Sequence, residues 1–282
     1  MSLRFTKMHA LGNDYVYVGL FDQTVDDPAA LSKTISDRHR GVGGDGLILI
    51  GPPRSTEAHV RMQMFNADGS RSEMCGNGIR CVAKLAYERG WAHQNPLLVE
   101  TDVGVRVLEL TIDEADKVSA ARVDMDEPIL DPHRIPVAQA GERVVGLSVP
   151  VGGRVLSATC LSIGNPHAVF FTDAIARVPL DEWGPRIERH PLFPKRINVH
   201  FVQVLKKDRV KLVSWERGSG KTQSCGSGAC AACVAGVLNG KTQRSVTIEQ
   251  FGGVLKLEWD ETTNHVFMTG PATELFTGEW LG

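Results

Sequence analysis

Met74-Cys75-Gly76-Asn77-Gly78 and Ser224-Cys225-Gly226-Ser227-Gly228 decide the fold of this chain, because the second stretch repeats the first after 150 residues. In each, a cysteine and a Gly-x-Gly sequence stand between a polar loop and a run of small and apolar residues, which predicts a helix that begins just after the cysteine. A cysteine at that position has its sulfur close to free backbone N–H groups and to the positive end of the helix dipole, and both favour the thiolate. We therefore expect Cys75 and Cys225 to form a matched pair that faces one substrate.

The duplication extends beyond the two cysteines. Leu11-Gly12-Asn13 precedes the first cysteine, and Ile163-Gly164-Asn165 precedes the second. Both predicted helices end near a glycine, at Gly90 and Gly240. Coincidences that recur in the same order indicate an internal repeat of roughly domain size.

The composition suits two domains and excludes several classes of protein. The 282 residues are 42% hydrophobic, which is enough for a core in each half. We expect an N-terminal lobe over residues 1–126 and a C-terminal lobe over residues 127–270, with the proline-rich stretch 127–132 as the linker. The net charge of −2 without a basic stripe argues against nucleic acid and anionic membrane as partners.

Further features indicate the compartment. The chain has no apolar run of transmembrane length, and its first residues lack the apolar core of a signal peptide. Six cysteines without a secretory signal are typical of reduced thiols rather than of a disulfide framework. We therefore expect a cytoplasmic protein.

Short alternating runs predict a chain rich in strands. The predicted strands cover 4–8, 15–18, 47–50, 60–65, 97–101, 105–110, 118–125, 155–161, 168–171, 198–205, 210–215, 246–250, 254–259 and 265–269. Apolar helices are predicted at 75–89 and 225–239, and shorter helices at 28–37 and 185–189. Because regular β-α-β alternation is absent, we expect an α+β fold with two pseudo-symmetric lobes, each a barrel-like sheet around a central helix.

Motifs that suggest a cofactor do not fit their surroundings. Residues 41–46 match G-x-G-x-x-G, but a strand-like run follows them where a dinucleotide site needs a helix. Residues 218–222 end like a phosphate loop, but Trp215 stands where its first glycine would be. Cys230 and Cys233 have redox-motif spacing, yet they fall inside an apolar helix, where cysteine usually acts as a small hydrophobic residue. No second Cys/His pair completes a zinc site. We expect no cofactor and no metal.

Two other polar elements are candidates for the site. His167 lies in the duplicated Gly-Asn element, which leaves a structural and a functional role equally open. Glu216-Arg217 is a charged pair at a strand end, nine residues before Cys225, and this location favours a substrate role over a merely solvated one.

Two facing thiols can invert a stereocentre. One thiolate removes a proton from one face of a carbon, and the opposite thiol donates a proton to the other face, so that each cysteine is a base in one direction and an acid in the other. An amino acid α-proton is very weakly acidic, so the carbanion needs help. Backbone N–H groups at the two helix starts, in Gly76-Asn77 and Gly226-Ser227, can bind the α-carboxylate as charge moves onto it.

This constellation resembles the diaminopimelate epimerase family of cofactor-independent amino acid epimerases, over essentially the whole chain. The motifs that carry the resemblance are residues 7–15, 65–70 leading to 75–78, 164–167, and 216–218 leading to 225–230. The resemblance implies two similar lobes with the active site in the cleft between them. It also implies that the tail 271–282 returns to the first lobe and that the protein is a homodimer.

The resemblance also implies residue roles. Cys75 and Cys225 match the acid/base pair, and His167 and Glu216 match polar groups close to the reacting amine. Residues that match the family's substrate contacts, including those at the distal amino-acid end, are Asn13, Asn66, Asn165, Asn198, Glu216 and Arg217. Gly46 stands where some members carry glutamine, and Lys221 stands where many carry glutamate. The lysine either supports a thiolate or points to solvent.

The leading interpretation is epimerisation of LL-diaminopimelate to meso-diaminopimelate, in lysine and peptidoglycan precursor synthesis. A related racemase of another amino acid, such as histidine, is the nearest alternative, although Asn66, Asn198 and Arg217 favour a substrate with a distal charged head. Isomerases of the proline racemase type share the two-thiol logic but have different cysteine motifs. A thiol redox protein is the alternative from another class, and it predicts a functional Cys230/Cys233 pair.

Overall fold

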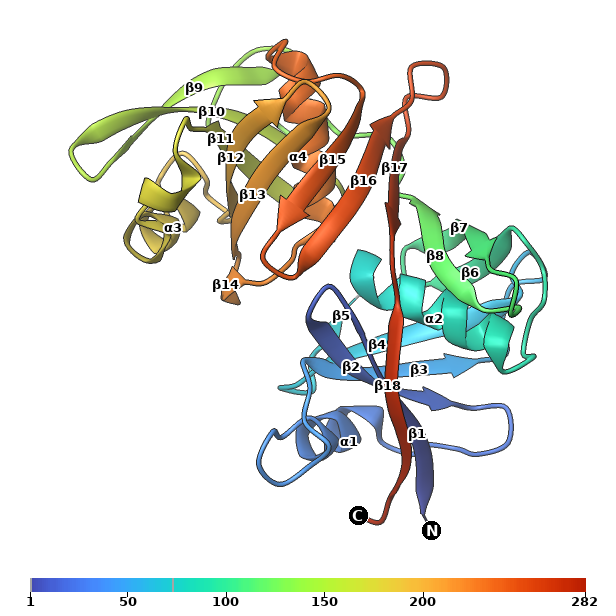
Figure 1. Ribbon diagram of the computed structural model, residues 1–282. Coiled ribbons are helices and arrows are strands. Elements are labelled where there is room, and N and C mark those ends of the chain that lie inside the picture. Colours follow the sequence, from blue (N-terminus) through green and yellow to red (C-terminus); the bar gives the residue numbers. More distant parts are fainter. Residues whose placement is uncertain (1, 73) are drawn as a thin grey trace. The chain divides into compact units, whose positions relative to one another are not determined.

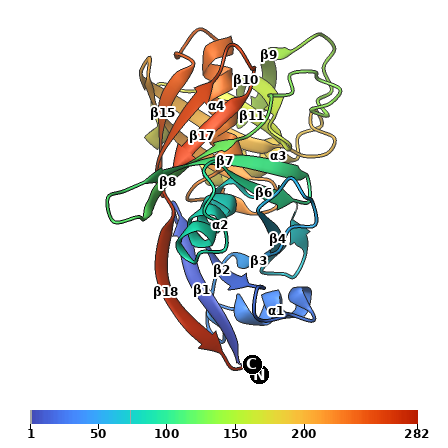
Figure 2. The ribbon, with the colours of Figure 1, turned by 90° about the vertical axis from the view of Figure 1, so that its right-hand side faces the viewer.

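The computed structural model describes residues 2–72 and 74–282. The chain divides into two compact units, Met1–Asp124 with Thr269–Gly282 (unit 1) and Met125–Met268 (unit 2). Figures 1 and 2 show each unit as curved strands with a helix among them. Each unit is described by itself below.

Unit 1 is built from the N-terminal strands and the last strand of the chain. Its elements are β1 (Leu3–Ala10), β2 (Asn13–Gly19), α1 (Pro28–Ile35), β3 (Gly46–Gly51), β4 (Val60–Asn66), β5 (Arg71–Ser72), α2 (Gly76–Glu88), β6 (Leu97–Thr101), β7 (Gly104–Ile112), β8 (Val118–Asp124) and β18 (Thr273–Trp280). β18 pairs antiparallel with β1, and β1 pairs antiparallel with β2. The C-terminal segment is therefore an integral strand of this unit.

Unit 2 has elements of the same kind. They are β9 (Val144–Val151), β10 (Arg154–Ser162), β11 (Pro166–Phe171), the 3-10 helix η1 (Ile175–Arg177), α3 (Leu180–Glu188), β12 (Asn198–Lys206), β13 (Arg209–Glu216), β14 (Gly220–Thr222), α4 (Gly226–Leu238), β15 (Ser245–Gln250) and β16 (Gly253–Trp259), followed by β17 (Val266–Gly270) at its end.

The two units repeat one topology. In unit 1, β2–β3 is parallel, β3–β4 antiparallel, β4–β6 parallel and β6–β7 antiparallel. In unit 2, the same sequence of pairings joins β11–β12, β12–β13, β13–β15 and β15–β16. The register matches too, because Tyr15 pairs with Gly46 where His167 pairs with Asn198. The sequence repeat is thus a repeat of strand order and of residue positions.

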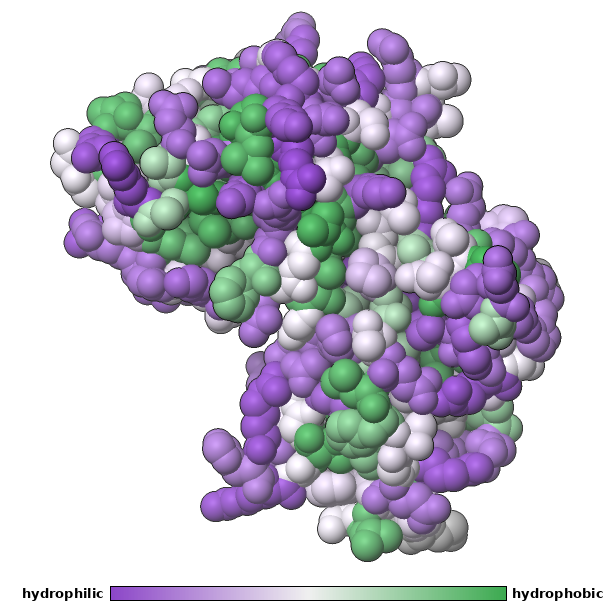
Figure 3. Space-filling model, viewed as in Figure 1, coloured by the Kyte–Doolittle hydropathy of each residue, from purple (hydrophilic) through white to green (hydrophobic). Residues whose placement is uncertain are grey.

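A central helix lies against the sheet in each unit. α2 packs on β1, β2, β3, β4, β6, β7 and β8, and α4 packs on β10, β11, β12, β13, β15 and β16 (Figures 1 and 2). α2 buries Ile79, Val82, Leu85 and their neighbours, whereas α4 is buried along almost its whole length. Small residues allow strands to surround α4 closely. Hydrophilic residues predominate on the visible face of both units (Figure 3).

The predicted fold class is confirmed: the chain is α+β, with a sheet curved around one helix in each of two similar halves. The predicted strands are present, but β5, β9, β14 and β18 were not predicted from the sequence. The predicted helix at 185–189 is wrong in its bounds, because α3 begins at Leu180, with Asp181 and Glu182 in its first turn and Pro185 inside it. None of the described helices is long and apolar enough to cross a membrane.

Candidate functional site

The two cysteines cap the two central helices in the same way. Cys75 precedes α2 with extended backbone (φ −133°, ψ 119°), and Cys225 precedes α4 with φ −124° and ψ 112°. The backbone N–H of Gly78 donates to the sulfur of Cys75 over 3.4 Å, and the N–H of Gly228 donates to that of Cys225 over 3.3 Å. Each sulfur thus takes the place of an N-cap oxygen, which satisfies an N–H group that the helix cannot.

In unit 1, Asn13 lies against the half-buried Cys75. The Cys75 thiol donates to Asn13 Oδ1 over 3.5 Å, and Asn13 Nδ2 donates to Asp45 Oδ2 over 2.6 Å. Asp45 was not predicted from the sequence, although it lies in the glycine-rich stretch 41–46, whose surroundings do not fit a dinucleotide site. The structure therefore brings Asn13 to the first cysteine and holds its orientation through Asp45.

Basic residues hold the carboxylates around Asn13. Lys7 bonds to Asp14 over 2.6 Å and also donates to the Gly43 carbonyl, while Arg38 bonds to both Asp14 and Asp45. Burial opposes ionisation of Asp14, but the hydrogen bonds from Arg38 and Lys7 outweigh it and lower its pKa. This polar cluster fixes the start of β2, where Asn13 lies.

Other predicted residues of unit 1 are tied to their own surroundings. Asn66 ends β4 and donates from Nδ2 to Ser70 Oγ over 2.9 Å. Asn77 Oδ1 accepts from Arg80 Nη2 over 2.9 Å, and Arg80 Nη1 also donates to the Gly76 carbonyl. Arg80 is fully buried and was missed, because nothing in an apolar helix signals a structural arginine. It stiffens the first turn of α2, which carries Gly76 and Asn77.

In unit 2, Cys225 is held more tightly than its counterpart. It is 3% exposed, its backbone N–H donates to Gln250 Oε1 over 2.8 Å, and its sulfur lies 3.7 Å from Ser227 Oγ. Burial, followed by the neighbouring Glu216 carboxylate, raises the pKa of the Cys225 thiol well above its usual range. The hydrogen bond from Gly228 at the helix start favours the Cys225 thiolate, but desolvation and a like charge outweigh it.

The strand end beside Cys225 carries Glu216. Its Oε1 accepts from Thr222 Oγ1 over 2.6 Å, across the β13–β14 pair. Lys221 is exposed and lies 3.6 Å from Asp181, so it points to solvent and α3 rather than toward a thiolate. Glu216 is thus the charged side chain that acts on the Cys225 thiol.

His167 belongs to a buried chain of hydrogen bonds. Its Nε2 lies 2.8 Å from Asn165 Oδ1, and its Nδ1 lies 2.9 Å from His200 Nε2. His200 Nδ1 in turn lies 2.8 Å from Ser214 Oγ. Burial lowers the pKa of His167 well below its usual range, with His200 and Arg217 adding to the effect, and burial lowers the pKa of His200 to about 3. Both imidazoles are therefore neutral at physiological pH.

Asn198 holds the residue that follows Glu216. Its Nδ2 donates to the Pro166 carbonyl over 2.9 Å, and its Oδ1 accepts the backbone N–H of Arg217 over 2.8 Å. The exposed guanidinium of Arg217 donates from Nη1 to the Lys195 carbonyl over 3.1 Å. The structure thus groups Asn165, His167, Asn198 and Arg217 around neighbouring strand ends of unit 2.

His200 and Gln250, which support these residues and Cys225, were not predicted from the sequence. Gln250 ends β15, and nothing in its local sequence separates it from a solvated strand end. His200 lies in the apolar strand β12, and an aligned internal repeat would have found it, because the corresponding position of unit 1 is the apolar Ile48. A polar residue where the repeat has an apolar one is the usable signal.

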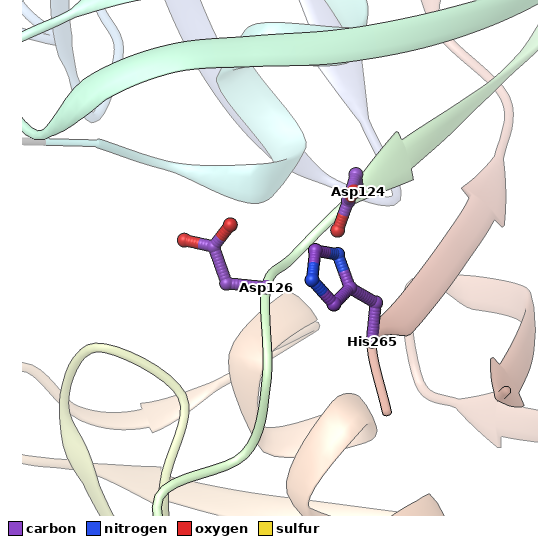
Figure 4. A group of neighbouring side chains, drawn as sticks. All are labelled: Asp124, Asp126 and His265. Carbon is purple, nitrogen blue, oxygen red and sulfur yellow. The ribbon is translucent and has the colours of Figure 1, made fainter. Parts of the chain in front are cut away.

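Two groups of side chains bear on the questions of metal binding and redox chemistry. In unit 2, a ligand atom of Asp126 and one of His265 lie within 4.8 Å of each other; Figure 4 draws both with Asp124, the last residue of unit 1. These side chains have other interactions of their own. Cys230 and Cys233 are buried inside α4, and burial raises the pKa of Cys233 to about 12, which makes it a poor nucleophile. The absence of a metal and of a cofactor stays a prediction.

The fold is shared with solved structures of low sequence identity. A phenazine biosynthesis protein of the PhzF family from Bacillus anthracis superposes with a TM-score of 0.70 at 15% identity, over 100% of both chains. A hydroxyproline epimerase from Agrobacterium vitis superposes with a TM-score of 0.68 at 13% identity, over 99% of this chain and 91% of its own. These likenesses show the fold.

Sequence comparison is more specific. The diaminopimelate epimerase of Acetivibrio thermocellus is 50% identical over 98% of this chain and 98% of its own. The family model described as diaminopimelate epimerase matches residues 5–130 and 159–275, which include both helix starts. The chain therefore belongs to the diaminopimelate epimerase family.

Proposed function

We propose that this protein epimerises LL-diaminopimelate to meso-diaminopimelate by a two-thiol mechanism without a cofactor or a metal. The observation that carries the proposal is the identical capping of α2 and α4 by Cys75 and Cys225, in a chain of this family. In the proposal, the two sulfurs act on opposite faces of the substrate α-carbon.

The chemistry follows from that arrangement. One sulfur takes the α-proton from one face, and the other thiol donates a proton to the opposite face. Because the C–H bond breaks on one face and forms again on the other, the centre is inverted. The N–H groups of Gly76-Asn77 and Gly226-Ser227 bind the α-carboxylate and stabilise the charge that moves onto it. The site then holds one exchangeable proton shared between two cysteines.

The state of Cys225 suggests how turnover begins. Its raised pKa makes it a thiol at neutral pH, which suits the acid role toward the incoming substrate. The half-buried Cys75 is then the base in that direction, after it loses the proton that its thiol donates to Asn13 Oδ1, and the roles exchange in the reverse reaction. Burial is the main cause of the raised Cys225 pKa, and binding of the substrate ammonium beside Glu216 would offset the carboxylate charge that adds to it.

The remaining predicted residues recognise the substrate in this proposal. His167 and Glu216 lie close to the reacting amine, and Asn13, Asn66, Asn165, Asn198 and Arg217 hold the substrate and its distal amino-acid head. An arginine fork and several amides suit a second carboxylate and ammonium. A racemase of another amino acid is the alternative, and it predicts turnover of a substrate without that distal head.

The direct test is incubation of the protein with LL-diaminopimelate in deuterated water under reducing conditions. We expect α-deuterium in the product and conversion to the meso form. Isotope exchange with another amino acid but not with diaminopimelate would favour the alternative racemase. Dialysis against a chelator and treatment with carbonyl reagents should leave the rate unchanged, and activity restored only by a metal or by pyridoxal phosphate would contradict the mechanism.

The two-base assignment has its own test. Cys75→Ala and Cys225→Ala should each abolish epimerisation, because a single thiol cannot serve both faces. Each variant should still eliminate halide from a halogenated substrate analogue of one configuration, since elimination needs only the base. The two variants should prefer opposite configurations. A shared preference would show that the thiols do not act on opposite faces.

We also infer a homodimer that works in the cytoplasm. The family resemblance supports the dimer, and six cysteines that are unbridged in this structure suit a reducing compartment. Light scattering on the purified protein at micromolar concentration should give twice the chain mass of 30.7 kDa. A single-chain mass would contradict the dimer.

A further inference from the structure

The hydrogen-bonded chain behind Asn165 has an apolar counterpart in unit 1. His200 pairs with Ser214 in β12–β13, and the corresponding pair in β3–β4 is Ile48 with Met64. A methyl group on Gly228 would lie 2.3 Å from His200 Cε1, and one on Gly78 would lie 2.7 Å from Ile48 Cδ1. His200 and Ile48 therefore fill the same space beneath the first turn of their helices.

This equivalence separates packing from polar function. An isoleucine and a methionine satisfy the packing in unit 1, so packing alone does not require polar side chains at these positions. Burying His200 and Ser214 costs free energy unless each polar atom finds a partner. Here both ring nitrogens of His200 have one. The polar pair of unit 2 therefore serves the residues that it contacts, His167 and, through it, Asn165.

The partners determine the direction of the hydrogen bonds. Both imidazoles are neutral, so each has one N–H donor and one acceptor nitrogen. Asn165 Oδ1 only accepts, so His167 Nε2 carries the proton and donates to it. His167 Nδ1 then accepts a hydrogen bond from His200 Nε2–H, and His200 Nδ1 accepts a hydrogen bond from the Ser214 hydroxyl. The side-chain oxygen of Asn165 thus accepts from His167, and its amide NH2 is the group that can bind a ligand.

We propose that His200 is a positioning residue that, with Ser214, holds His167 in its Nε2-protonated tautomer and so turns the amide NH2 of Asn165 toward a substrate carboxylate. The proposal rests on the proposed function, because it takes an amino acid carboxylate as the ligand. The reversed chain would present the Asn165 carbonyl oxygen, which repels a carboxylate. His200 would therefore contribute to substrate binding without touching the substrate.

Nitrogen-15 NMR of histidine-labelled full-length protein reads the tautomer directly. We expect His167 and His200 to give the spectra of neutral rings protonated at Nε2, identified by loss of their signals in His167→Gln and His200→Gln. A wild-type His167 protonated at Nδ1 would overturn the proposal. This reading does not depend on any enzymatic activity.

Variants then connect the tautomer to substrate binding. His200→Ile copies the packing of unit 1 and removes the donor to His167, so the Nε2-protonated form should lose its preference. His200→Gln keeps a donor toward His167 and an acceptor toward Ser214, and should retain most of the wild-type behaviour. Ser214→Ala removes the hydroxyl with a smaller change in volume, and Ser148→Ala, on an exposed position of β9, is the matched control.

Kinetics complete the test. A contact to a charged carboxylate that is lost equally in the ground state and the transition state raises KM, so we expect KM to rise about tenfold or more in His200→Ile while kcat changes much less. Loss of the tautomer with an unchanged KM would overturn the connection to Asn165. Failure of the wild type to epimerise diaminopimelate, with the expected tautomer present, would overturn the proposed function instead. Melting curves establish that each variant is folded, and Ser214→Ala replaces His200→Ile if the latter is not.

Discussion

The two cysteines show how surroundings decide ionisation when backbone geometry is the same. Both sulfurs accept a hydrogen bond from the first turn of a helix, which favours the thiolate. Cys225 is nonetheless buried and adjacent to Glu216, and these effects keep it protonated. A helix start is therefore insufficient evidence for a thiolate, because the cost of desolvation can exceed the gain from the helix dipole.

The pH dependence of alkylation tests this reading. In a Cys75→Ala background, the reaction of Cys225 with iodoacetamide should accelerate only at a pH above the ordinary cysteine pKa of about 8.5, because the raised pKa delays formation of the thiolate. Glu216→Gln removes a nearby negative charge, so it should move the midpoint to lower pH. Glu182→Gln, at an exposed position of α3, should not move it. A wild-type midpoint below that of free cysteine would contradict the assignment.

Gln250 provides a second prediction at this scale. Gln250→Ala removes the acceptor of the Cys225 backbone N–H and leaves that donor buried, which should lower the free energy of unfolding by about 1–3 kcal/mol. It should also slow turnover, because the cap that orients the sulfur is loosened. Urea titration measures the first effect, with the exposed Gln243→Ala as control. Gln250→Glu retains an acceptor and should lose less stability than the alanine variant.

At the scale of elements, the first turns of α2 and α4 offer a matched pair of substitutions. A methyl group on Gly78 meets the mobile ends of Ile48 and Met62, at 2.7 and 3.3 Å. Alanine also favours a helix by about 1 kcal/mol over glycine, so Gly78→Ala should be nearly neutral. On Gly228 the same group meets the His200 ring, which two hydrogen bonds hold in place. Gly228→Ala should therefore cost about 1–3 kcal/mol in urea unfolding. Equal effects would show that the His200 ring moves aside freely.

The elements that were predicted correctly depend on local signals. The start of α2 and that of α4 follow from a cysteine, a Gly-x-Gly sequence and an apolar run, and these features act over a single turn. β18 was not predicted, because the strand that it pairs with, β1, lies at the other end of the chain. The start of α3 was predicted wrongly because Pro185 suggested a helix start. The helix begins at Leu180 instead, and Asp181 and Glu182 supply its acidic first turn.

The candidate site likewise contains residues that local sequence signals identify and residues that only the fold brings together. Most of its side chains lie next to motifs that the sequence displays, such as the glycine that precedes Asn13 and the one that precedes Asn165. The residues that hold these side chains in place do not lie next to such motifs. Asp45, Arg80, His200 and Gln250 reach the site through strand pairing or burial, so their neighbours in sequence say nothing of their role. Contacts of this kind require the fold.

At the scale of the whole molecule, duplication explains why the units are alike in backbone and unlike in detail. One strand order and one capped helix occur in both. The polar side chains that accompany them differ, since Tyr15, Ile48 and Met64 of unit 1 correspond to His167, His200 and Ser214 of unit 2. Symmetric thiols suit a reaction that runs in both directions, and dissimilar surroundings suit a substrate whose ends must be distinguished.

If the two thiols flank one carbon, oxidation should connect the units. Sulfurs that close around a substrate are near enough to bond once it is absent, so a mild oxidant should link Cys75 to Cys225 and abolish activity, with recovery on addition of dithiothreitol. Peptide mapping by mass spectrometry identifies the linked pair, and bound substrate should slow the reaction. Cys225→Ser should remove the linkage while the other thiols stay reduced, because Cys160, Cys230 and Cys233 are buried. A Cys230–Cys233 linkage found instead would favour the thiol redox interpretation, since a pair inside α4 has no place in the epimerase mechanism.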